Sequence, residues 1–205
     1  MFDPYLYEDC PVLRNKLGLK DGGLLDKAEV ELSCNAIHEL LTNPLHGDYD
    51  FVHLCQFLAR IFRDVYDWAG QPRTVPIEKQ EAILGYMSIA YSKPQSIEAD
   101  ATAVLQEMKD IDWGSLSIDE QATSFSKCLA DLWKVHPFRE GNTRTTITFI
   151  CQFAESRGLS LERTLFERNA VYLRSALVAA SAVFDDGDFR KPEYLVKIVR
   201  DSISR

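Results

Sequence analysis

The chain has 205 residues, 46% of them hydrophobic, which is enough to form the core of one large domain or two small ones. Its net charge of -8 and pI near 5.0 argue against general binding to nucleic acid backbones. No apolar run approaches a membrane span, and the N-terminus lacks the basic and apolar regions of a signal peptide. Five scattered cysteines without a CxxC pair predict reduced thiols in a cytoplasmic protein.

The first part of the chain predicts an arm, two helices and a flap. Residues 1–22 carry aromatic side chains with little periodicity, which indicates an extended N-terminal arm packed on the domain. Helical periodicity covers 24–41 and then runs from an N-cap at Asp50 to about Trp68. Residues 71–80 combine β-favouring residues with two prolines, which predicts a small hairpin or flap. The side chains of the first helix that are expected to face the core are Leu25, Ala28, Leu32, Ala36 and Leu40.

The remainder of the chain is predicted to be helical. A capping box, Ser117 followed by Glu120, opens a helix that continues to about Val135. There is no internal repeat and no obvious linker, so we expect one all-α domain over 1–205 with a small β-hairpin flap. The predicted helices of this part cover 82–91, 96–109, 117–135, 146–158, 169–184 and 192–203.

The stretch that starts at His136 carries the chemistry. The amino end of a helix binds anions because its first N–H groups have no intrahelical partner. Gly141 lets a ligand approach the backbone, Asn142 can cap the helix or donate its amide to phosphate, and Arg144 suits a second phosphate. Glu140 is a hard oxygen ligand for Mg²⁺, and His136 can take a proton from an incoming hydroxyl. The set predicts phosphoryl or nucleotidyl transfer.

A structural alternative exists for each of these residues. His136 and Pro137 can simply end one helix, Gly141 and Asn142 can turn the chain, and Arg144 can lie in solvent. A single residue would favour that interpretation. The ordered set between two strongly patterned helices favours function.

The stretch also resembles the signature of the Fic family, H-x-F-x-(D/E)-G-N-G-R-x-x-R. Residues 12–18 resemble the family's N-terminal arm, and 64–70 with 73–75 resemble the helix and flap ahead of its active site. The similarity covers roughly residues 10–185. It implies a Fic-type helical bundle in which 136–147 form the catalytic loop and helix start. The positions that match the signature in type and spacing are His136, Phe138, Glu140, Gly141, Asn142 and Arg144.

Fic proteins typically transfer AMP from ATP to a hydroxyl side chain of a target protein and release pyrophosphate. The resemblance implies that His136 is the general base and that Glu140 holds Mg²⁺ between the α- and β-phosphates. Phosphate would be cradled by Gly141, Asn142 and Thr143, with Arg144 also on the phosphates, while Phe138 anchors the loop.

The resemblance further implies that the flap holds the target by main-chain pairing, as in strand addition. The implied docking residues are Arg73, Thr74, Val75 and Ile77. Because main-chain pairing tolerates many sequences, the flap identifies neither the target protein nor the modified residue.

Two positions depart from the signature. Thr143 replaces the second glycine, which is awkward only where the backbone needs a positive φ. Ile147 replaces the second arginine, which is expected to meet the γ-phosphate, so nucleotide orientation and preference stay open. Arg139 and Arg174 are the candidates to compensate.

Regulation is expected to come from outside the chain. Many Fic proteins carry an inhibitory helix motif, (S/T)-x-x-x-E-(G/N). Here a glutamate followed by Gly or Asn occurs only at Glu140, and the residue four positions earlier is His136. The chain therefore lacks that motif and is expected to be restrained in trans by a small antitoxin, or to be unrestrained. Homo-oligomerisation stays open.

Two other functions compete with AMP transfer. The fold also supports kinases and other nucleotidyl or phosphoryl transferases; the related Doc kinases depart at the Gly-Asn-Gly turn, and retention of Gly141 and Asn142 favours AMP transfer. A catalytically degenerate binding or regulatory module is supported only by Thr143 and Ile147.

Overall fold

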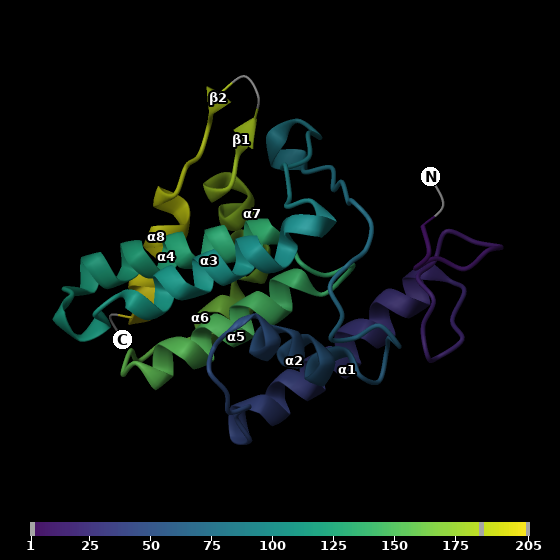
Figure 1. Ribbon diagram of the computed structural model, residues 1–205, viewed down its shortest axis with the longest axis horizontal. Helices are drawn as coiled ribbons and strands as arrows, with labels where there is room; N and C mark the ends of the chain where they lie inside the picture. The colour runs from purple at the N-terminus through teal and green to yellow at the C-terminus, as the bar shows by residue number, and fades with distance from the viewer. Residues whose placement is uncertain (1–2, 185–186, 204–205) are drawn as a thin grey trace.

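The computed structural model describes residues 3–184 and 187–203, and within them it confirms the predicted helical architecture (Figure 1). Three 3-10 turns join the main elements: η1 (Ala82–Leu84), η2 (Pro94–Ser96) and η3 (Trp113–Ser115). One antiparallel hairpin pairs β1 (Val183–Phe184) with β2 (Gly187–Asp188). The α-helices of the described residues are α1 (Gly22–Thr42), α2 (Phe51–Phe62), α3 (Ile97–Asp110), α4 (Ile118–Val135), α5 (Asn142–Ser156), α6 (Arg163–Arg168), α7 (Ala170–Ala180) and α8 (Glu193–Ile203).

Helix α4 is the centre of the fold, and its carboxyl end leads into the signature loop. It begins with the predicted capping box, in which Ser117 Oγ accepts from the Glu120 amide and the Glu120 carboxylate accepts from the Ser117 amide. It packs against α3, α5, α7 and α8. Among its side chains, Leu129 and Trp133 are 0% exposed. This packing fixes the place where the chain turns from α4 into α5.

Helices α1 and α2 form a second unit that lies against α5. Asp50 caps α2 as predicted, accepting from the His53 amide. The inward side of α1 differs from the prediction, because Ala28 and Leu32 are only half-buried. The buried positions of α1 are Leu25, Glu29, Ser33, Ala36 and Leu40. Two polar side chains therefore point inward from α1.

The predicted second helix ends six residues early, at Phe62, because the N-terminal arm takes its carbonyl groups. The Lys16 amide donates to the Val65 carbonyl, and Lys16 Nζ donates to the Arg63 carbonyl, both at 2.7–2.8 Å. In a longer helix, these carbonyl oxygens would instead accept from backbone N–H groups four residues later. The arm is packed on the domain, as predicted, with Tyr5 and Asn15 buried.

Two other predicted helices are also wrong in extent. Residues 82–91 form only the turn η1, because Gly85 and Tyr86 adopt positive φ angles of 63° and 68°. The predicted helix over 169–184 ends at Ala180, and the chain then enters the β1–β2 hairpin.

The small hairpin is thus present, but not at residues 71–80. That segment forms no strand in the described structure. Its prolines provide no N–H for a ladder, and the Arg73 side chain holds it instead, donating to the carbonyls of His136, Val75 and Ser92. The hairpin projects from the helical body after α7 (Figure 1).

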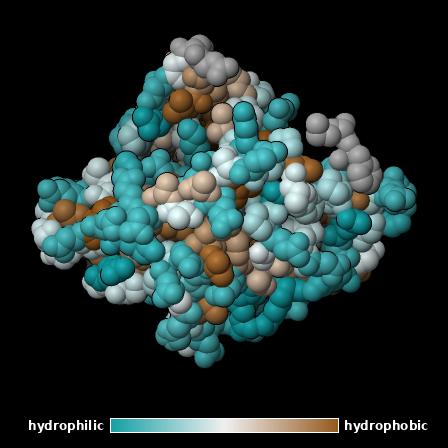
Figure 2. Space-filling view, in the orientation of Figure 1, coloured by the Kyte–Doolittle hydropathy of each residue, from teal (hydrophilic) through white to brown (hydrophobic). Residues whose placement is uncertain are grey.

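The polar surface and the unpaired cysteines are those expected from the amino-acid composition. The face drawn in Figure 2 is mainly hydrophilic, with apolar residues in small separate groups. All five cysteines are free, and burial raises the pKa of Cys128 and Cys151 to about 12, so both remain thiols. No helix among the described residues is long and apolar enough to cross a membrane.

Candidate active site

Gly141 and Asn142 shape the loop between α4 and α5. Gly141 has φ +82°, and a Cβ there would lie 2.3 Å from the Phe62 ring, so only glycine fits. The Asn142 side chain accepts from the Phe138 amide at 2.9 Å and donates to the Phe138 carbonyl at 2.8 Å. Phe138 is 0% exposed and anchors the loop in the core, as expected. Both the oxygen and the nitrogen of the Asn142 side chain thus bind the Phe138 backbone, which leaves the backbone amide of Asn142 as its group at the start of α5.

Thr143 suits the loop despite the departure from the signature. It lies in the first turn of α5 and has no positive φ, so a glycine is not required there. Its hydroxyl accepts from Trp133 Nε1 at 2.9 Å, which ties the start of α5 to α4. The first amides of α5 have no acceptor four residues back within the helix, and they carry the positive end of its dipole. These amides give the start of α5 the means to bind an anion.

His136 is a buried, neutral base. It is 1% exposed and stacks on Tyr91, with ring centroids 4.1 Å apart. Burial, and next the charge of Lys79, hold the pKa of His136 well below its ordinary value. Nδ1 lies 3.2 Å from the Trp133 carbonyl, which can only accept, so Nδ1 carries the proton. The lone pair is then on Nε2, which has no partner in the described part of the chain.

Glu140 faces the same space as an ionised carboxylate. Burial alone would raise its pKa, but the Lys79 charge and the Gly141 amide lower it overall. Lys79 Nζ lies 3.1 Å from Oε2, and the Gly141 N–H donates to Oε1 at 2.9 Å. A cation therefore already sits against the predicted metal ligand.

The Arg144 side chain lines the cavity and also binds residues of α1. Its guanidinium donates to the Glu29 carboxylate and to Ser33 Oγ, and it lies 4.8 Å above the Phe62 ring. Glu29 also accepts from the Tyr66 hydroxyl. The side chain of Arg144 is 27% exposed. The structural alternative of an arginine free in solvent is thus wrong, and Arg144 reaches the cavity from a fixed position.

These groups meet in one cavity of about 200 Å³. Ligand pockets commonly measure about 300–1,000 Å³, so this volume suits phosphate groups better than a whole nucleotide. The cavity contains several cations and one carboxylate. It is lined by Lys79, His136, Glu140, Gly141, Asn142, Thr143, Arg144 and Arg174.

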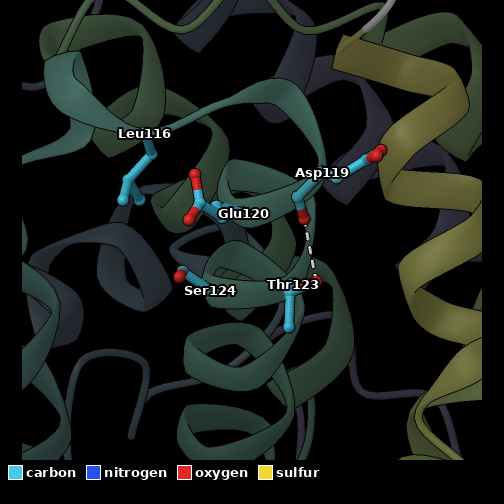
Figure 3. Close-up of a pocket in the computed structure, with 5 residues that line it drawn as sticks. All are labelled: Leu116, Asp119, Glu120, Thr123 and Ser124. Carbon is cyan, nitrogen blue, oxygen red and sulfur yellow. Dashed lines mark hydrogen bonds between the residues drawn. The ribbon is translucent and has the colours of Figure 1, made fainter.

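A second hollow, of about 390 Å³, lies at the start of α4 (Figure 3). Its lining residues are Leu116, Asp119, Glu120, Thr123 and Ser124. The polar groups there serve local structure: Glu120 closes the capping box, and the Thr123 hydroxyl donates to the Asp119 carbonyl at 2.8 Å (Figure 3). Its lining among the described residues includes two carboxylates and no lysine, arginine or histidine, so it does not suit a phosphate.

The comparisons with known proteins agree with the geometry. A profile of the Fic/DOC family matches residues 48–154. A Sinorhizobium fredii protein named "Probable protein adenylyltransferase y4lH" is 32% identical over 80% of this chain and 82% of its own length. The chain belongs to the Fic/DOC family. Protein adenylyltransferase VbhT of Bartonella schoenbuchensis is 30% identical over 81% of this Fic chain, which spans 34% of VbhT.

Solved structures show the same Fic fold. BepC of Bartonella tribocorum, solved with bound AMPPNP, matches with a TM-score of 0.79 at 17% identity, over 97% of this chain and 95% of that one. At this identity the likeness concerns the fold. The helical bundle expected from the signature is thereby confirmed.

Not every expected site residue of this Fic chain lies in the cavity. Arg73 is 2% exposed with its guanidinium bound internally, so its side chain cannot dock a target. Arg139 pairs with Asp3 at 2.8 Å and is not among the lining residues. Ile147 packs against the apolar core. Of the other flap residues, Thr74 is exposed and Val75 is half-buried.

Sequence reasoning missed several residues of the site. Lys79 and Tyr91 come from the segment between α2 and α3, and their approach to Glu140 and His136 depends on how that segment folds back. Glu29 offered a usable signal, because it lies four residues from Leu25 and from Ser33 on the inward side of α1.

Proposed function

We propose that this Fic chain is a protein adenylyltransferase that transfers AMP from ATP to a hydroxyl side chain of a target protein. The observation that carries the proposal is the neutral base of His136, which lines a phosphate-sized cavity at the start of α5 and whose buried Nε2 has no hydrogen-bond partner among the described residues. Both curated relatives described above carry the name adenylyltransferase, which supports the same activity here.

The residues fit the bonds that must change. The target hydroxyl oxygen forms a bond to the α-phosphorus, the bond from that phosphorus to the bridging oxygen breaks, and pyrophosphate leaves. Nε2 of His136 accepts the hydroxyl proton, since Nδ1 already carries a proton and donates it to the Trp133 carbonyl. The first amides of α5 and the guanidinium of Arg144 stabilise the phosphate charge.

Glu140 is the residue that would hold Mg²⁺. Its carboxylate lines the cavity and is 31% exposed. No group of three or more His, Cys, Asp or Glu side chains suitable for a metal occurs among the described residues. A single carboxylate fits Mg²⁺, which keeps several waters and binds substrate phosphates rather than a cage of side chains. When bound, Mg²⁺ would offset the negative charge of the phosphates.

The flap is proposed to bind the target through its backbone. Within the described residues, the amides of Val75, Ile77 and Glu78 donate to no other group. Such free donors support pairing with an extended segment of the target. Thr74 and Ile77 would then contact target side chains, whereas Arg73 would only support the flap from beneath.

We further propose that the chain acts in the cytoplasm, where ATP is available and its five thiols stay reduced. The lack of an inhibitory motif supports restraint in trans by a small antitoxin. Co-purification of a short partner chain would agree with this restraint. Full activity of the isolated, pure chain with ATP would count against it.

The deciding experiment is labelling with ATP in a cell lysate. We expect label on protein from α-labelled ATP and none from γ-labelled ATP. Label from γ only would make the chain a kinase, and label from neither would favour a binding module. His136→Ala should abolish labelling while the circular dichroism spectrum stays unchanged. Labelling that survives this substitution would exclude the proposed mechanism.

A further inference from the structure

We propose that Arg174, on helix α7 and outside the signature, binds the terminal phosphates of the nucleotide in place of the arginine that Ile147 replaces. This inference rests on the proposed function, because it concerns how the same cavity holds ATP. It assigns a substrate-positioning role to a residue 30 positions after Arg144 in the chain.

The cavity itself selects between the candidate arginines. Arg174 lines it, whereas Arg139 does not and is bound to Asp3 through both Nε and Nη2. Ile147 is packed against the core and is not among the lining residues. Among the described arginines, only Arg144 and Arg174 line the cavity. Arg144 donates to the Glu29 carbonyl, the Glu29 carboxylate and Ser33 Oγ, whereas Arg174 donates only to the two oxygens of Glu81 among the described residues, so Arg174 has more free donors.

The Arg174 guanidinium is held in place while most of its donors stay free. Nη1 and Nη2 donate to the Glu81 carboxylate at 2.7 and 2.9 Å. A guanidinium has about five N–H donors, so these two bonds leave the others for a ligand. The side chain is 42% exposed, whereas that of Glu81 is 6% exposed. One edge of the Arg174 guanidinium is thus fixed by a buried carboxylate, while the partly exposed side chain lines the cavity.

Glu81 is itself fixed by the chain around it. Its amide donates to the Met87 carbonyl, and its own carbonyl accepts from the amides of Leu84 and Tyr86. The pair therefore joins the η1 turn to α7. A planar, pre-positioned guanidinium suits two oxygens of a phosphate group better than a flexible ammonium does.

The electrostatic balance supports an anion at this place. Lys79, Arg144 and Arg174 line the cavity, and Glu140 is the only carboxylate that does so within residues 3–184 and 187–203. The charges of both Lys79 and Arg174 act on His136 and lower its pKa. Binding of a polyphosphate would offset this excess of positive charge.

A purely structural role is the competing explanation, since Arg174 also neutralises a buried carboxylate. The two roles differ in their dependence on the ligand. A phosphate contact affects a triphosphate and spares AMP, whereas a structural defect weakens all nucleotides alike and lowers stability. Binding of AMPPNP, ADP and AMP to the full chain with Mg²⁺, measured by titration calorimetry, separates them.

We expect Arg174→Ala to weaken AMPPNP binding by about tenfold or more, as for loss of a charge-assisted bidentate contact. AMP binding should change by less than about twofold. Arg174→Lys should lie between Arg174→Ala and the wild type, since lysine keeps the charge and loses the fork. Glu81→Gln with Arg174→Ala should show the same selective loss without an unpaired buried carboxylate, which guards against misfolding of the single variant.

Arg163→Ala is the matched control. Arg163 forms a similar bidentate pair with Glu155, at 2.6 and 2.7 Å, near the far end of α5 from the cavity. The substitution Arg163→Ala should leave the affinity for AMPPNP unchanged. Equal affinity of the double variant and the wild type for AMPPNP would overturn the inference, and so would an equal loss for all three nucleotides.

The outcome also separates this inference from the proposed function. Wild-type chain that binds AMPPNP but transfers no α-label would refute the adenylyltransferase proposal, while the nucleotide series still decides the role of Arg174. Wild-type chain that transfers α-label, with an unchanged KM for ATP in Arg174→Ala, would refute the role of Arg174 and leave the adenylyltransferase proposal intact.

Discussion

His136 adopts a left-handed backbone conformation, with φ 50° and ψ 58°, at the carboxyl end of α4. Residues other than glycine rarely do so, and such strained positions gather at functional sites. This conformation places the imidazole ring of His136 against the Tyr91 ring and brings Nδ1 within hydrogen-bond distance of the Trp133 carbonyl. One backbone feature therefore fixes both the position of the base and the nitrogen that carries its proton.

Burial of neutral histidine predicts a loss of stability in acid. The pKa values of His136 and His53 are lowered, mainly by burial, so the folded chain stays neutral at both sites below pH ~6.5. The unfolded chain takes up protons there, and the free energy of unfolding falls as the pH drops. Between about pH 7.5 and 5.5 the loss should be larger for His136, whose pKa is lowered further, than for His53. Urea unfolding should show a smaller fall in His136→Gln; an unchanged fall would contradict a neutral His136.

Substitution of Gly141 should lower the free energy of unfolding by more than its positive φ alone would cause, because a side chain there would clash. Gly141→Ala places a Cβ 2.3 Å from the Phe62 ring at φ +82°. Gly158 has the same φ, and a Cβ there meets no atom within 4 Å. We expect Gly158→Ala to cost about 1 kcal/mol and Gly141→Ala about 1–3 kcal/mol more, measured by urea unfolding. Equal costs would mean that the loop moves freely away from Phe62.

At the scale of elements, α1 and α5 are joined by a buried polar group rather than by apolar packing alone. Glu29 on α1 binds both the Arg144 guanidinium and the Tyr66 hydroxyl, and Ser33 binds Arg144 from the next turn. The carboxylate of Glu29 is only 10% exposed. Helix α1 thus sets the direction from which Arg144 enters the cavity.

Removal of this carboxylate should destabilise the chain strongly. Glu29→Ala leaves the partly buried Arg144 without a counter-charge and the Tyr66 hydroxyl without its acceptor, at a cost of about 3–5 kcal/mol. Glu39 on the same helix is the control, because its pair with Arg60 is exposed and Glu39→Ala should cost at most about 1 kcal/mol. Thermal unfolding of both variants tests the difference. Similar melting temperatures for the two would refute a structural role for Glu29.

At the scale of the whole molecule, the cavity draws on distant parts of the chain. Lys79 precedes the η1 turn, His136 and Glu140 follow α4, and Arg174 comes from α7. The Lys79 ammonium lies against Glu140 and the Tyr91 ring covers His136. A nucleotide must displace part of this cover, which is consistent with a cavity of only about 200 Å³.

A ligand that joins these segments should stabilise the chain as one unit. We expect a single calorimetric transition, as for one domain. AMPPNP with Mg²⁺ at about 100 times its Kd should add about 2.7 kcal/mol, or roughly 5–10 °C in Tm for a chain of this size. His136→Gln should keep the shift, because the base is not needed for binding. Two separate transitions would contradict a single domain, and no shift would contradict a nucleotide site.

The local order of residue types determined the fold class and the centre of the site. The capping box at Ser117, the cap at Asp50 and the loop from His136 to Arg144 depend on neighbours in sequence, and the structure has them where they were expected. Local patterns act through backbone geometry and nearby hydrogen bonds, which the sequence contains directly. The helices and the turn that leads into α5 follow from them.

Only the tertiary structure decided the features that depend on distant partners. Helix α2 ends early because the N-terminal arm donates to the Val65 carbonyl. The Arg73 side chain is an internal support because it donates to carbonyls from three segments. The choice of Arg174 over Arg139 came from where α7 packs, which no local pattern encodes. The sequence by itself determined the Fic signature loop and its place between two helices, because both depend on local patterns; long-range packing decided which cations line the cavity beside that loop.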